Sequence, residues 1–200
     1  LVGLEPRCGC GVAGHQGRER VTAKPSRLIA VDCVNGQALT DAARKLSAAH
    51  RRHKAGISAW GASGIFDELT VAEPEAGIPS MRTLLLLYAA DLAFRMRWEI
   101  RPALEEGRLV IAAPYVATAM ALGQAAGLEP EWLTDLFYFA PAANEHYVIE
   151  PPARQIGDRE GFVEFSWRRL DTQGGDLTKR QLMDRTQRHL RAIARRVSRA

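Results

Sequence analysis

Continuous apolar runs alternate along the chain with segments whose apolar residues recur at helical spacing. Arg27–Val34 (RLIAVDCV) is an unbroken run rich in branched residues, which is typical of a strand covered on both faces of a parallel sheet. Asn35 and Gly36 turn the chain, and apolar residues then recur every three or four positions from Leu39 to Ala49. The pattern therefore predicts strand, turn and helix in succession.

The same alternation continues to the end of the sequence. Pro79 and Ser80 suit a helix start and Gly107 suits a stop, so we expect one long helix between them. Phe162–Leu170 is expected to be the last strand, with a lid helix as the alternative. The other strands are expected within Ala55–Gly64, Arg108–Tyr115 and His146–Glu150, and the other helices within Ile65–Glu73, Val116–Gly127, Glu129–Ala140 and Asp176–Val197.

Strands separated by helices predict an α/β layered fold with a mainly parallel sheet and helices on both faces. In such folds ligands bind beyond the carboxyl ends of the strands. Candidate functional residues are therefore sought in the loops at residues 33–39, 58–64, 112–118 and 150–160.

Composition fits one globular domain, since 46% of the 200 residues are apolar and 25% are charged. Residues 1–26 are rich in Gly and Arg and lack apolar periodicity, so we expect a flexible extension before a domain at 27–200. The apolar run Leu84–Ala90 is far shorter than the roughly 20 residues of a membrane span. The N-terminus lacks a signal-peptide core, so a cytoplasmic protein is expected.

The formal charge of +4 is concentrated towards the two ends of the chain. Solvated ends explain it better than a nucleic-acid surface, which remains the weaker alternative. Cys8, Cys10 and His15 do not have the spacing of a zinc site, and Cys33 is alone, so no metal is expected.

The segment Leu84–Leu133 carries a specific resemblance. Its sequence, LLLLYAADLAFRMRWEIRPALEEGRLVIAAPYVATAMALGQAAGLEPEWL, follows without a gap the pattern LLFAADRAQHVxxxIRPALxxGxxVLCDRYxxSxxAYQGxxxGLxxxWL of the thymidylate kinase family of P-loop nucleoside monophosphate kinases. RLIAVDCVNGQALT is similar to that family's FIxFEGxDGxGKTT. The resemblance covers residues 27–152 and implies the three-layer fold of P-loop NTPases.

The resemblance also implies a degenerate Walker A loop. Family members use loop N–H groups, a lysine and a hydroxyl to hold nucleotide phosphates and magnesium. Here Leu39 stands at the lysine position, while Asn35, Gly36, Gln37 and Thr40 are the remnant that could still contact a nucleotide.

Three further charged motifs of the family are neutral in this chain. Ala113 and Pro114 replace the Asp and Arg of the DRY motif, and Leu92 replaces an arginine of the long helix. Ser58–Ala62 replaces an Arg-Glu-Pro-Gly-Gly turn. Because phosphoryl transfer depends on positioning and electrostatic stabilisation, we expect most of the mechanism to be lost.

The nucleoside pocket that the resemblance implies is less altered. Tyr88 takes the place of the base-stacking Phe, Tyr115 is kept, and Thr118 replaces a Ser near the base. Gly123 replaces the family's Gln. Tyr88 could also be a plain core residue, because it lies within an amphipathic helix.

The lid expected at about residues 151–161 is short, and Arg154 and Arg159 are its candidate phosphate contacts. Arg95, Arg97 and Arg101 are weaker candidates, most of which we expect to be solvated.

The expected function is that of a thymidylate-kinase-like pseudokinase with a binding or assembly role and no required cofactor. The alternative is a divergent kinase that phosphorylates dTMP or a related nucleotide with ATP and Mg²⁺. Family members are commonly homodimers through their long helices, so dimerisation through residues 80–106 is also expected.

Overall fold

The computed structural model describes residues 26–61, 80–151 and 179–197. The expectations for residues 1–25, for a helix over 65–73 and for a strand or lid helix over 162–170 lie outside these residues. So does the expected lid, apart from Pro151.

A parallel sheet forms the centre of the described fold. It contains β1 (Arg27–Asp32), β2 (Gly56–Ala59), β3 (Leu109–Ala113) and β4 (Glu145–Val148), in the order β2-β3-β1-β4. Every neighbouring pair is parallel. This arrangement confirms the predicted α/β class and brings the carboxyl ends of all four strands to one edge.

The central strands β1 and β3 are buried almost throughout, whereas the edge strands β2 and β4 are more exposed, as their less apolar sequences predict. Alternate residues of β1 face opposite layers. Ile29 and Val31 share a core cluster with Leu39 of helix α1 (Gly36–Ala49). Leu28 and Ala30 pack in a second cluster, whose helices include α3 (Met81–Arg95), α5 (Val116–Ala125), α6 (Pro130–Leu136) and α8 (Lys179–Val197).

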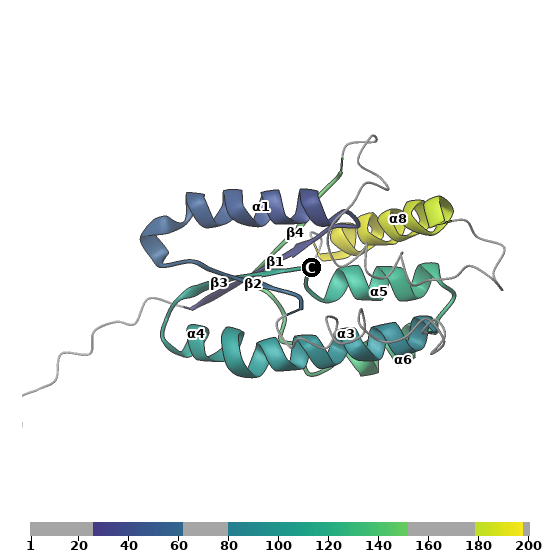
Figure 1. The fold of residues 1–200 in the computed structure, drawn as a ribbon, viewed down its shortest axis with the longest axis horizontal. Helices are drawn as coiled ribbons and strands as arrows, with labels where there is room; N and C mark the ends of the chain where they lie inside the picture. Colours follow the sequence, from purple (N-terminus) through teal and green to yellow (C-terminus); the bar gives the residue numbers. More distant parts are fainter. Residues whose placement is uncertain (1–25, 62–79, 152–178, 198–200) are drawn as a thin grey trace, which may run out of the picture.

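Figure 1 shows the resulting layers, with α1 on one side of the sheet and α3 and α4 (Arg101–Glu105) on the other. Helices α5 and α8 lie side by side and make extensive contact with each other. None of the described helices is long and apolar enough to cross a membrane.

The expected long helix is present but interrupted. Helix α3 continues through a π-helical turn, η3 (Met96–Ile100), into α4. The backbone N–H of Arg101 donates to the carbonyl of Met96, five residues back. Pro102 explains the interruption, because its ring lacks an N–H and would clash with the carbonyl four residues earlier.

The helix boundaries follow the expected caps. The Ser80 side chain accepts from the backbone N–H of Thr83, and Pro130 occupies the first turn of α6. Gly107 adopts a φ of 71°, which lets the chain leave α4 in a left-handed turn. Helix α1 begins at Gly36, earlier than the apolar repeat indicates, because Asn35 caps it.

Gly123 allows close packing between α5 and its neighbours. A Cβ atom there would lie 2.5 Å from Leu133 Cδ2 and 2.9 Å from Leu85 Cδ1. Both leucines are fully buried, so neither has free space to move into. The larger Gln that the family pattern has here would not fit this packing.

We predict that Gly123→Ala destabilises the protein by about 1 kcal/mol, measured by urea unfolding. Overpacking costs about 1–3 kcal/mol, and the better helix propensity of Ala offsets about 1 kcal/mol of it. Gly56→Ala is the control, because nothing lies within 4 Å of its added Cβ. A net stabilisation by Gly123→Ala would contradict the close approach of Leu85 and Leu133 to position 123.

Candidate functional site

The loop between β1 and α1 is short and buried. Cys33, Val34 and Asn35 are each at most 2% exposed. The Asn35 side-chain oxygen accepts from the backbone N–H of Ala38 at 2.8 Å, which satisfies one of the free donors at the helix start. This loop holds the position that the sequence comparison assigned to phosphate binding.

The predicted remnant residues are divided between the interior and the surface. Asn35 and Gly36 are buried, whereas Gln37 and Thr40 are exposed in the first turns of α1. Gln37 Nε2 donates to Asp41 Oδ1 at 2.9 Å, so the amide is used within the helix. Their contact with a nucleotide stays a prediction.

Leu39 faces the core. Its exposure is 5%, and its cluster consists of apolar residues from β1, β3 and α1. The side chain at the lysine position of the family pattern therefore contributes to packing between α1 and the sheet. It supplies no charge to the carboxyl edge.

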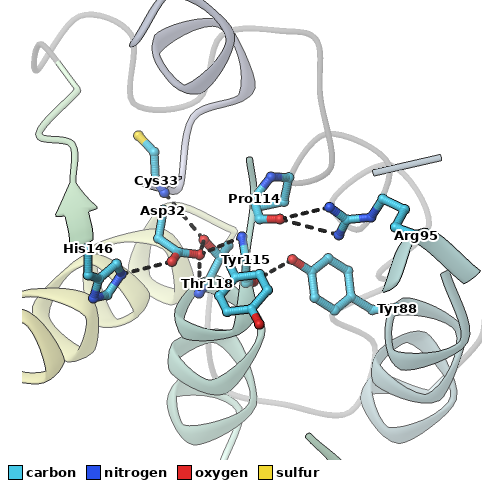
Figure 2. Close-up of polar contacts among 8 residues, drawn as sticks. All are labelled: Asp32, Cys33, Tyr88, Arg95, Pro114, Tyr115, Thr118 and His146. Carbon is cyan, nitrogen blue, oxygen red and sulfur yellow. Dashed lines mark hydrogen bonds and ion pairs between the residues drawn. The ribbon is translucent and has the colours of Figure 1, made fainter. Parts of the chain in front are cut away.

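The Asp32 carboxylate joins three elements at that edge. Asp32 is fully buried at the end of β1. Its Oδ1 accepts from the backbone N–H of Tyr115 at 3.1 Å, and from the backbone N–H and hydroxyl of Thr118 at 2.9 and 2.7 Å. Its Oδ2 lies 2.9 Å from His146 Nε2 on β4 (Figure 2).

Asp32 also caps α5 from a distance. The N-cap residue Tyr115 makes no side-chain capping bond, so the first turn of α5 relies on the Asp32 carboxylate. Negative charge at a helix N-terminus is favourable because the helix dipole and free N–H groups point there. Sequence reasoning missed this role, and the only signal for it was an acidic residue inside an apolar strand.

His146 was also missed. Its side chain is 10% exposed, and it approaches Asp32 across the β1–β4 pair. A histidine oriented by a buried carboxylate resembles the orienting half of a hydrolase triad. Cys33, the neighbouring thiol, does not complete one, because burial raises its pKa to about 11 and its sulfur points away from the Asp32 carboxylate (Figure 2).

The three predicted nucleoside-pocket residues lie close together in the interior. Tyr88 is fully buried, and its hydroxyl donates to the Tyr115 carbonyl at 2.6 Å. The Tyr115 hydroxyl donates to the Pro141 carbonyl at 2.7 Å. Burial raises the pKa of both phenols, because the charged phenolate form would be desolvated. Tyr88, Tyr115 and Thr118 thus serve packing in this structure, and base stacking stays a prediction.

Arg95 differs from the solvated cation expected for this helix. It is fully buried, and its Nε donates to Asp91 Oδ2 at 3.0 Å. Its terminal nitrogens donate to the backbone carbonyl of Pro114 at 3.2 and 3.3 Å (Figure 2). One of them also donates to the Ser58 carbonyl at 3.3 Å. The sequence contained an indication of this buried ion pair, since Asp91 and Arg95 lie four residues apart on the apolar side of the predicted helix.

The remaining arginine candidates are Arg97, Arg101, Arg154 and Arg159. Arg97 and Arg101 are exposed on the long helix, as expected of solvated charges. Arg154 and Arg159 lie outside the described residues. In the described ranges, Arg95 is the one buried cation, and no three His, Cys, Asp or Glu side chains are grouped to hold a metal ion.

Known proteins match parts of this chain. A stretch of 70 residues is 37% identical to a probable thymidylate kinase of Pyrococcus abyssi and covers 35% of this chain and 34% of that protein. A stretch of 84 residues is 37% identical to a probable thymidylate kinase of Thermococcus gammatolerans and covers 40% of each. The chain thus spans little more than a third of these relatives. No family model matches it.

The fold comparison extends further along the chain. The crystal structure of thymidylate kinase from Ehrlichia chaffeensis covers 86% of this chain and 87% of its own, with a TM-score of 0.58 and 14% identity. At that identity the match establishes the fold alone. The local sequence matches support a relationship to the thymidylate kinase family, and the structural match shows a shared fold.

Proposed function

We propose that this protein is a thymidylate-kinase-like pseudokinase, without ordinary dTMP kinase activity, that serves a binding or assembly role. The observation that carries the proposal is the burial of Leu39 in the core between α1 and the sheet. A phosphate-binding loop needs a cation that reaches the β- and γ-phosphates. Leu39 takes the place of that cation and fills the space with packed apolar atoms.

The use of the buried charges supports the same proposal. Arg95 donates to Asp91 and to the backbone carbonyls of Ser58 and Pro114. Ser58 lies within β2, and Pro114 directly follows β3. A guanidinium with these partners is already neutralised and hydrogen-bonded. It therefore contributes to fold stability rather than to transition-state charge.

We predict no dTMP kinase turnover above background in a coupled assay with ATP, Mg²⁺ and dTMP. Losing one electrostatic contact typically costs about 10²–10³-fold in kcat, and several are missing here. An active thymidylate kinase is the positive control. Turnover that scales with protein and is abolished by Thr40→Ala would overturn the proposal in favour of a divergent ATP- and Mg²⁺-dependent kinase.

We predict that Arg95→Met lowers the free energy of unfolding by about 3–5 kcal/mol, because it leaves the buried Asp91 carboxylate without its cation. The exposed Arg97→Met is the matched control and should change stability by less than about 0.5 kcal/mol. Urea unfolding measures both. Adding Asp91→Asn to Arg95→Met should recover stability, and a further loss would argue against a neutralised internal pair.

The surface of the long helix supports an assembly role. Leu86, Phe94 and Trp98 are 52, 38 and 64% exposed, although large apolar side chains are usually buried. The rings of Phe94 and Trp98 lie 6.5 Å apart, one helical turn from each other. Their spacing places all three along one side of α3 and η3. We propose that a second copy of this chain packs against this side.

We predict a homodimer that Phe94→Glu/Trp98→Glu converts to monomer in sedimentation velocity experiments, because two carboxylates would be desolvated in the interface. Tyr138→Glu is the control, since Tyr138 is also an exposed aromatic residue, at 84%, but lies beyond α6. A monomeric wild-type protein would exclude this assembly, and so would a dimer that the double variant leaves intact.

A further inference from the structure

Helix α8 borders two hollows. The larger, about 450 Å³, is lined by Gln124 and Ala125 of α5 and by Arg185, Arg188 and His189 of α8. The smaller, about 200 Å³, is lined by Val34 of the β1–α1 loop and by Met183, Asp184, Gln187, Arg188 and Arg191 of α8. Because Arg188 lines both, the two hollows adjoin.

Three basic side chains border the larger hollow. Among the described residues, no acidic one lines it, and none forms an ion pair with Arg185, Arg188 or His189. Arg188 Nε makes only a long contact, 3.4 Å, to a carbonyl of its own helix. The surroundings therefore favour an anion between α5 and α8.

Arg191, on the same helix, is neutralised by an ion pair with Glu150. Its guanidinium forms two 2.6 Å hydrogen bonds to the Glu150 carboxylate. This pairing lowers the pKa of Glu150, with the hydrogen bonds from Arg191 as the main cause. The anion preference of α8 is thus confined to the side that Arg185, Arg188 and His189 share.

The smaller hollow contains a buried acceptor that lacks a donor. Gln187 is 4% exposed, and its Nε2 donates to the Ile149 carbonyl at 3.4 Å. Its Oε1 is buried and has no hydrogen-bond partner among the described residues. Because this oxygen has almost no accessible surface, a ligand in the hollow does not reach it, and the anion preference is confined to the larger hollow.

We propose that α8 and α5 form a binding site for a phosphorylated small molecule. Its phosphates lie against Arg185, Arg188 and His189. Arginine forks match phosphate oxygens, and the volume suits a ligand of nucleotide size. The site gives a ligand class to the binding role proposed above, but it does not depend on loss of kinase activity.

Titration calorimetry with inorganic triphosphate and with ADP, both without Mg²⁺, tests this site. We expect both to bind, and Arg185→Gln/Arg188→Gln to weaken each by at least about tenfold, as loss of charge-assisted hydrogen bonds implies. The control Arg44→Gln/Arg195→Gln removes the same charge from exposed positions outside both hollows and should leave both affinities within about twofold.

Three outcomes would overturn the proposal. The first is that neither probe binds, and the second is that the control double variant loses as much affinity as Arg185→Gln/Arg188→Gln. The third is that Gln37→Glu loses affinity while Arg185→Gln/Arg188→Gln does not. The last outcome would place the anion at the start of α1, where Gln37 is exposed. Since these experiments measure binding and not turnover, their failure is distinguishable from a failure of the pseudokinase proposal.

Discussion

The Asp32 carboxylate is the interaction on which the carboxyl edge of this fold depends. A buried carboxylate is costly unless hydrogen bonds stabilise its charge, and Asp32 receives them from the start of α5 and from His146 of β4. The same contacts satisfy backbone donors that α5 would otherwise leave free. One side chain at the end of β1 thereby fixes the entry of α5 and links two neighbouring strands.

The buried charged residues at this edge all have partners within the protein. Asp32 is satisfied by α5 and His146, and Asp91 is paired with Arg95, whose remaining donors meet backbone carbonyls of Ser58 and Pro114. Polar groups at this edge therefore hold protein elements together. On α8 the situation is reversed, since Arg185 and His189 meet no acidic partner in the described ranges.

Much of the fold could be predicted because the signals were local. The apolar runs of β1 and β3, the Ser80 cap and the Gly107 stop each depend on a few neighbouring residues. The interruption after Arg95 was not predicted, because the helical repeat continues through it and only Pro102 marks it. The links from Asp32 to Thr118 and His146 span 86 and 114 residues, and no pattern along the chain reveals such distant pairs.

The packing of Leu39 has an evolutionary consequence. A lysine at that position would have to enter a cluster of apolar side chains that includes Ile29, Val31 and Ile111, or leave a void between α1 and the sheet. A single Leu39→Lys change is therefore penalised by stability. The core has entrenched Leu39, so a basic residue can be accommodated at this position only through compensating changes in several packed residues at once.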